Sequence, residues 1–326
     1  MVMNHLKFAF DRQNQFWKYL VTFLVSFFVV GFIGSIPLIV IAIIKVVQNG
    51  DINNITPDLL SSLGNLGIPL NVLLALFLFP LVLGFFSLIP MFRWLHRRTL
   101  KEMINGTNRI RLNKLFWGAA IWAVLQGVYL LADCLINSTN YVLQFNLSAF
   151  IPLVIISLLL IPFQTSFEEV FFRGYLVQGI ASWTKSRWCV ILIPSVLFGL
   201  MHSFNPEVKE FGFWITMPQY IFYGLIFGLA SVMDDGIELA MGAHAANNIF
   251  LSLFVTHASS TLQTDAVFSL LSVNPIKELV VLIIMGILFL VFLSWKYGWN
   301  YSLLNKYLTK NHHESNQINI SIIETI

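Results

Sequence analysis

The chain has 326 residues, of which 57% are hydrophobic and only 11% are charged, and its formal net charge is +3. A soluble globular domain carries about 25% charged residues, so this composition excludes an ordinary soluble protein and predicts an integral membrane protein. No basic patch with interleaved aromatic residues is present, which argues against a nucleic-acid partner. The two cysteines are too few for a disulfide framework or a CxxC metal site.

Apolar runs long enough to cross a bilayer as helices, about 20 residues each, predict an all-α polytopic protein with eight spans in one domain, residues 1–326. In chain order the predicted spans are Tyr19–Ile44, Ile68–Phe92, Leu115–Ile136, Ala149–Ile180, Trp188–Phe204, Phe213–Met233, Leu239–Thr256 and Leu279–Trp295. The fourth is too long for one straight crossing and contains Pro162, so we expect a bend there. Residues 300–326 are expected to form a flexible tail.

Lysine and arginine in short loops indicate which side of the membrane each loop faces. These residues cluster before the first span, between the second and third spans, after the fourth and after the eighth. The loop between the third and fourth spans, Asn137–Ser148, has no charge. The pattern predicts a multi-pass protein of the cell membrane with both termini in the cytoplasm, in agreement with an even number of spans.

Ionisable residues inside spans are rare, because each costs about 2.5–3.5 kcal/mol at a helix centre even on insertion scales. The stretch "QTSFEEVFFRGYL" in the fourth span carries Glu168, Glu169 and Arg173. Glu169 and Arg173 are four positions apart, so they lie on one helix face within reach of an ion pair. Glu168 is turned by about 100° from Glu169. A buried ion pair that only stabilises packing therefore leaves Glu168 unexplained, and its partners must come from other helices.

Two further spans supply such partners. The stretch "VLFGLMHSF" places Phe198 and His202 four positions apart, and "GAHAANNIF" does the same for His244 and Asn248. Each spacing puts the pair on one helix face. We therefore expect Glu168, His202, His244 and Asn248 to form one polar site between the fourth, fifth and seventh spans. The expected depths disagree, because His202 comes late in its outward span while His244 comes early in its own.

These three stretches resemble the motifs of a known family. "EEVFFR" is similar to EExxxR, "FGLMH" to FxxxH and "HAANN" to HxxxN of the CAAX-protease and bacteriocin-processing (CPBP) family, which includes the type II CAAX prenyl proteases. The motifs stand in the family's order, and the resemblance covers residues 149–256. It implies an intramembrane endopeptidase, in a family often described as metalloproteases, that acts on a membrane-associated peptide or protein.

The resemblance also implies a role for each residue. Glu168 would activate water, His202 would help to hold it, and His244 and Asn248 would stabilise the oxyanion. The supporting residues would be Glu169, Arg173 and Phe198.

The sequence leaves alternatives open for both the cofactor and the activity. Glu168, His202 and His244 are the set that would hold zinc, but HExxH is absent and a glutamate with a histidine can activate water without metal. We expect no tightly bound metal, because the flanking sequence offers few second-shell acceptors for the two histidines. The rival functions are an ion-coupled transporter, whose membrane carboxylates and histidines relay protons, and a catalytically idle immunity or scaffold protein of the same fold.

Overall fold

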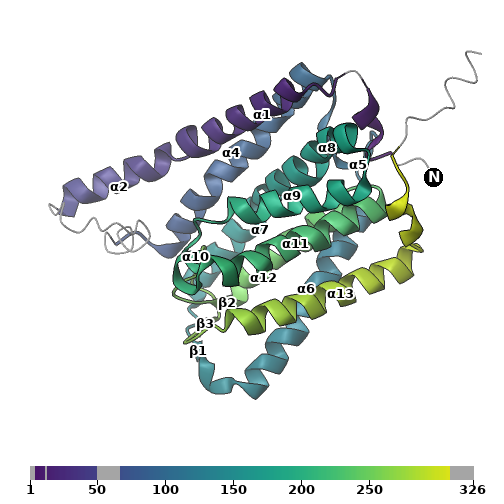
Figure 1. Cartoon of the computed structure of the whole chain (residues 1–326). Helices are drawn as coiled ribbons and strands as arrows, with labels where there is room; N and C mark the ends of the chain where they lie inside the picture. Colours follow the sequence, from purple (N-terminus) through teal and green to yellow (C-terminus); the bar gives the residue numbers. More distant parts are fainter. Residues whose placement is uncertain (1–3, 12, 50–66, 309–326) are drawn as a thin grey trace, which may run out of the picture.

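The computed structural model describes residues 4–11, 13–49 and 67–308, and it confirms an all-α membrane protein (Figure 1). The α-helices are α1 (Phe16–Phe28), α2 (Ile36–Asn49), α4 (Leu70–His96), α5 (Leu100–Asn105), α6 (Leu112–Ile136), α7 (Leu147–Glu169), α8 (Val177–Thr184), α9 (Arg187–Met201), α10 (Pro206–Phe211), α11 (Phe213–Asp234), α12 (Glu238–Phe254) and α13 (Pro275–Tyr297). Short 3₁₀ segments are η1 (Lys7–Phe10), η4 (Ser138–Asn140) and η6 (Tyr301–Asn305), and π-helical segments are η2 (Val29–Ile33) and η5 (Val170–Leu176).

Six helical stretches in the described part of the chain are long and apolar enough to cross a membrane, where the sequence predicts eight. The six are Phe16–Gln48, Leu70–His96, Leu112–Ile136, Leu147–Thr184, Phe213–Asp234 and Pro275–Tyr297. The predicted fifth and seventh spans are instead the shorter helices α9, with 15 residues, and α12, with 17. At 1.5 Å per residue they reach about 22 and 26 Å, less than the roughly 30 Å of a hydrocarbon core.

The short helix α12 is buried between α6 and α7, so it does not have to match the bilayer thickness. It approaches α6 backbone to backbone. A Cβ atom built on Gly242 would lie 1.9 Å from the carbonyl oxygen of Leu115, and one on Gly118 would lie 2.2 Å from that of Leu239. Small residues at membrane helix interfaces allow this close approach, which brings the polar face of α12 next to α6 and α7.

The irregular part of the fourth span lies further along the chain than the sequence predicts. Helix α7 runs without interruption through Pro162 and ends at Glu169. The next seven residues form the π-helical turn η5, which contains Arg173, and α8 then continues to Thr184. A π-turn adds a residue to the helical repeat and is frequent at functional sites. Here it directly follows the two glutamates.

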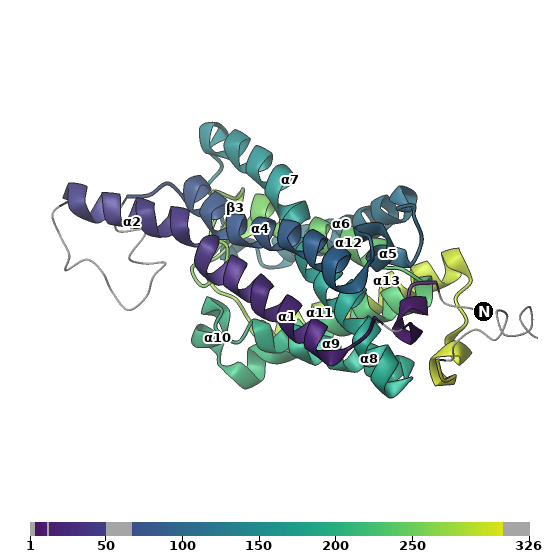
Figure 2. The same ribbon diagram turned by 90° about the horizontal axis from the view of Figure 1, so that it is seen from above.

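The two ends of the molecule are built differently (Figures 1 and 2). At one end β1 (Tyr141–Leu143) pairs antiparallel with β3 (Phe268–Leu270), which pairs parallel with β2 (Val255–Thr256). At the other end the described N-terminal segment (4–11) meets the described C-terminal segment (301–308), and Leu6 shares a buried cluster with Leu304 and Leu308.

The first residues of the predicted flexible tail include two buried side chains, Leu304 and Leu308, among mostly exposed ones. Positions 309–326 lie outside the described residues.

Candidate active site

Glu169, the last residue of α7, is buried and contacts both Arg173 and His244. Its Oε1 atom is 3.0 Å from Nη1 of Arg173, which is the pair expected from the four-residue spacing. The same oxygen lies 2.8 Å from Nδ1 of His244 on α12. The Glu169 side chain is 0% exposed and that of Arg173 is 1% exposed. Glu169 thus has its charge compensated and is closed off from solvent.

Glu168 has a different environment one position earlier. Its Oε1 accepts a hydrogen bond of 2.9 Å from Nε2 of Gln164, and its Oε2 lies 3.5 Å from Nε2 of His244. Its side chain is 13% exposed. Among the residues that the structure describes, no lysine or arginine forms a salt bridge with it. Glu168 is therefore a partly accessible carboxylate that only neutral or titratable groups contact.

The hydrogen bonds define how the two histidines face the site. Since a carboxylate only accepts, His244 donates through Nδ1 to Glu169 and turns Nε2 toward Glu168. His202 follows the last residue of α9, and its Nδ1 lies 2.7 Å from the carbonyl oxygen of Phe198, so this nitrogen also donates. In the neutral ring the remaining nitrogen, Nε2, is then an acceptor. Each histidine keeps Nε2 for a partner in the site.

Phe198 packs between the charged and the imidazole groups. Its ring centroid is 4.6 Å from that of His202, 6.0 Å from that of His244, and 4.4 Å from the guanidinium carbon of Arg173. His202 is also stacked on Tyr220 of α11, with ring centroids 4.4 Å apart. These contacts hold His202 beside the other motif residues.

Asn248 joins the site through Gln164. Its Nδ2 donates a 3.1 Å hydrogen bond to Oε1 of Gln164, and its Oδ1 accepts a 3.0 Å bond from Nδ2 of Asn247. Sequence reasoning missed Gln164 and Asn247, although Gln164 precedes Glu168 by four positions and Asn247 adjoins a motif residue. It also missed Tyr220, because one more aromatic residue in a phenylalanine-rich chain gives no sign of a role in a site.

One feature of the site suits a metal ion and another does not. Both histidines have an acceptor for Nδ1, Glu169 for His244 and the Phe198 carbonyl for His202. Such acceptors orient zinc ligands, and the few that the flanking sequence offers are not the ones used here: one acceptor comes from another helix and the other from the backbone. Yet within the described residues no three His, Cys, Asp or Glu side chains are gathered closely enough to hold a metal ion. The arrangement does not fit a metal centre, and we derive no step through one.

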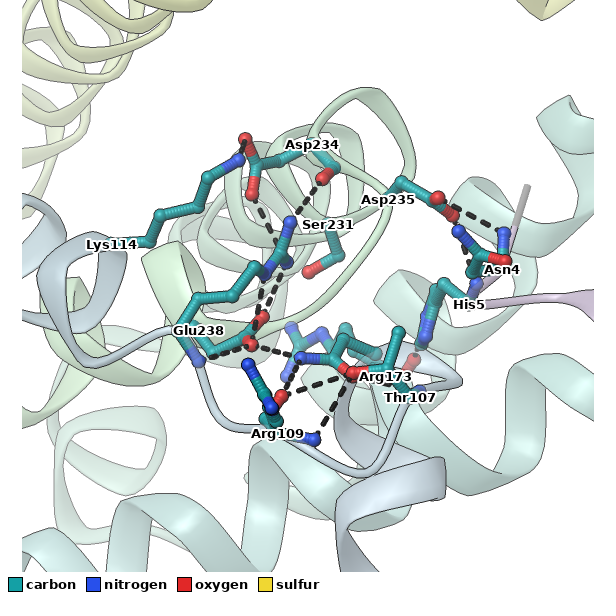
Figure 3. Close-up of polar contacts among 12 residues, drawn as sticks. Asn4, His5, Thr107, Arg109, Lys114, Arg173, Ser231, Asp234, Asp235 and Glu238 are labelled. Carbon is teal, nitrogen blue, oxygen red and sulfur yellow. Dashed lines mark hydrogen bonds and ion pairs between the residues drawn. The ribbon is translucent and has the colours of Figure 1, made fainter. Parts of the chain in front are cut away.

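The site is tied to the N-terminal segment that contains Asn4 and His5 (Figure 3). The carbonyl oxygen of Arg173, inside the π-turn, accepts a 2.9 Å hydrogen bond from Nε2 of His5. Asp235, which follows α11, in turn accepts from the backbone N–H groups of Asn4 and His5 at 3.0 and 2.9 Å. The N-terminal segment therefore packs directly against the turn that carries the Glu169 partner.

Beside this contact, an ion-pair network consists of Arg111, Lys114, Asp234 and Glu238 (Figure 3). Arg111 binds both oxygens of Glu238 at the start of α12, and Lys114 binds Asp234 at 2.6 Å. The network attaches the start of α6 to the end of α11 and the start of α12. It thereby fixes the first turn of the helix that carries His244.

Comparison with known proteins agrees with this geometry. Residues 147–250, from the start of α7 into α12, match the sequence profile of the type II CAAX prenyl endopeptidase Rce1-like family. This segment is therefore similar to the CAAX protease family. It contains all three motifs and every residue of the site, so the family assignment and the side-chain geometry concern the same part of the chain.

One curated relative covers most of the chain. The uncharacterized protein YyaK of Bacillus subtilis (strain 168) is 29% identical over 297 residues, which are 90% of this chain and 96% of the relative. The similarity thus extends beyond the family segment to the flanking helices. No solved structure is significantly similar to the chain.

Proposed function

We propose that the protein is an intramembrane endopeptidase that hydrolyses a peptide bond in a membrane-associated peptide or protein. The observation that carries this proposal is the environment of Glu168. It is a carboxylate among membrane helices, accessible and without a cationic partner in the described residues, and it lies beside His244 in a family segment with an intact motif set. Such a group is costly unless it has a function, and general base catalysis uses a carboxylate of this kind.

The hydrogen-bond roles lead to a mechanism without metal. A water molecule donates one hydrogen to Glu168 and the other to Nε2 of His202, and its oxygen attacks the scissile carbonyl carbon as Glu168 takes the first proton. The carbonyl oxygen becomes an oxyanion and accepts from the second N–H of Asn248 and, when His244 is protonated on both nitrogens, from its Nε2–H. Glu168 then passes its proton to the leaving amine, and the C–N bond breaks.

The central test is the variant Glu168→Gln, which keeps the size and polarity of the side chain but removes the base. Purified protein in liposomes is incubated with pools of lipid-anchored and prenylated peptides, and products are identified by mass spectrometry. We expect cleavage to fall by about 10²–10⁴-fold, the usual contribution of a general base, with thermal unfolding unchanged. The matched control is Glu210→Gln, an exposed glutamate on α10.

The outcomes separate the alternatives. Wild-type turnover in Glu168→Gln would overturn the proposal. Proton-coupled flux across the liposome without any cleavage would favour the transporter, and the absence of both would favour an idle scaffold. Chelation and readdition of zinc belong to the same assay: we propose that activity survives chelation, and activity that is lost with stoichiometric zinc and regained on its return would show a metalloprotease.

The orientation in the membrane is a separate part of the proposal. From the lysine and arginine pattern we propose that both termini face the cytoplasm, as does the end of the molecule where Leu6 packs with Leu304 and Leu308. In a variant lacking Cys134 and Cys189, cysteines placed at Thr107 and at Ser138 should be labelled from opposite sides. Labelling of Thr107→Cys from outside would reverse the assignment.

A further inference from the structure

The amide of Asn247 is oriented by three donors. Its Oδ1 accepts from Nε1 of Trp122 at 3.0 Å, from Nε2 of Gln126 at 3.0 Å and from the hydroxyl of Tyr223 at 3.1 Å. An indole N–H can only donate, so the group that faces Trp122 must be the oxygen of Asn247. The side chain is buried between α6, α11 and α12 and is 5% exposed. Its Nδ2 group is therefore obliged to point the other way.

Three hydrogen bonds that all run in the same direction connect Asn247 to Glu168. Nδ2 of Asn247 donates to Oδ1 of Asn248 at 3.0 Å, Nδ2 of Asn248 donates to Oε1 of Gln164 at 3.1 Å, and Nε2 of Gln164 donates to Oε1 of Glu168 at 2.9 Å. Each amide is oriented by the one before it, because an amide has its acceptor and its donor on opposite branches. The three amides form one directed chain, which we call the amide chain.

We propose that Asn247 is a positioning residue that, through the amide chain, holds Oε1 of Glu168 and thereby directs its Oε2 at His244 and the attacking water. This inference rests on the proposed peptidase function. It identifies a residue that acts on the base from a distance, through Asn248 and Gln164. If one amide turned over, an oxygen would face the carboxylate in place of an N–H group, and the hydrogen bond that aims Glu168 would become a repulsion.

The amide chain also determines which N–H group of Asn248 is already in a hydrogen bond. One N–H of its amide is used by Gln164, which leaves the other for an oxyanion. A loss of direction at Asn247 would therefore affect the base and the oxyanion donor together, although both residues would still be present.

The test compares two variants on the same pair of helices. Asn247→Leu removes the start of the amide chain. The control, Ser252→Ala, removes a buried 3.0 Å hydrogen bond between Ser252 of α12 and Ser157 of α7, which lies outside the chain. We expect Asn247→Leu to lower kcat by about 10–100-fold with KM within twofold, as for a misplaced catalytic group. Ser252→Ala should leave both constants within twofold.

A second measurement does not depend on activity. The carboxylate stretching bands of Glu168 are assigned in infrared spectra by their loss in Glu168→Gln. They should shift in Asn247→Leu and stay in place in Ser252→Ala, since only the first changes the hydrogen bond to the carboxylate. If Asn247→Leu fails to fold, Trp122→Phe with Tyr223→Phe removes two of the three donors while keeping the aromatic packing, and the same band should shift.

Either of two results would overturn the inference. One is an unchanged Glu168 band in every variant of the amide chain. The other is an equal fall of kcat in Ser252→Ala, which would show that any weakened α7–α12 contact has this effect. If the wild-type protein cleaves no peptide, the peptidase proposal fails by itself, and the infrared comparison still decides whether Asn247 orients Glu168.

Discussion

Two buried polar regions share helix α12 and differ in how they neutralise charge. In the ion-pair network at its first turn, Glu238 is bound by Arg111, and Asp234 by Arg111 and Lys114. In the site two turns further on, Glu168 is held by the amide of Gln164 and faces an imidazole. The first region has a cation for each carboxylate, and the second leaves one carboxylate without any among the described residues.

On the proposed function, the difference separates structural carboxylates from the catalytic one. A buried carboxylate beside a guanidinium is stabilised as an ion and is a poor proton acceptor, so Glu238 and Glu169 serve to join helices. A carboxylate without a cation beside it is a better proton acceptor than a paired one. Paired charges should thus control the stability of the molecule and Glu168 its chemistry, which the following variants test.

The largest effect on stability is expected for Arg173→Met. It removes the guanidinium from a fully buried Glu169 and leaves that carboxylate with His244 alone, and broken buried pairs cost about 3–5 kcal/mol. Reversible unfolding in mixed detergent micelles measures the free energy. The double variant Arg173→Met with Glu169→Gln removes both charges and should regain much of the loss. A double variant no more stable than the single one would contradict the role of this pair.

A somewhat smaller loss is expected for Glu238→Gln. It leaves Arg111 without the carboxylate that binds it at two points, but Asp234 remains 3.2 Å away. The free energy of unfolding should therefore fall by an amount near the lower end of the same range of about 3–5 kcal/mol. The variant should retain peptide cleavage per folded molecule. Loss of cleavage in protein that is fully folded would place Glu238 in the chemistry instead of in the scaffold.

The smallest effect concerns the N-terminal segment, which lies outside the membrane spans. Burial lowers the pKa of His5 below its usual 6.5, against the opposing effect of the Asp235 carboxylate. The neutral ring is therefore favoured in the folded protein. Its contribution to stability is complete above pH 6.5 and decreases as the pH falls from 6.5 toward the lowered value, because the unfolded chain takes up the proton first.

The variant His5→Phe tests the predicted direction of this pH dependence of stability. It loses the hydrogen bond to the Arg173 carbonyl, so stability at pH 8 should fall by about 1 kcal/mol. Between pH 8 and pH 5.5 its free energy of unfolding should decrease less than that of the wild-type protein. Parallel curves for the two proteins would show that His5 does not titrate on unfolding.

The sequence by itself determined the features that depend on composition and on local helix geometry. The excess of apolar residues requires a membrane, since so few charges cannot cover a soluble surface. The Glu169–Arg173 pair follows from four-residue spacing alone, and the same spacing predicted that His244 and Asn248 lie on one face. The family motifs then named the helices that had to meet.

Only the tertiary structure decided which groups these faces contact. The bond from Trp122 to Asn247 joins residues 125 positions apart, and that from His244 to Glu169 joins residues 75 apart. Neither contact follows from periodicity, because a contact between helices depends on how each helix is rotated and how far it is shifted along its axis. For α6 and α12, the close packing at Gly118 and Gly242 fixes both. Helices α9 and α12 were predicted as full spans for the same reason. Apolar runs show that a helix is buried, while its neighbours decide whether protein or lipid buries it.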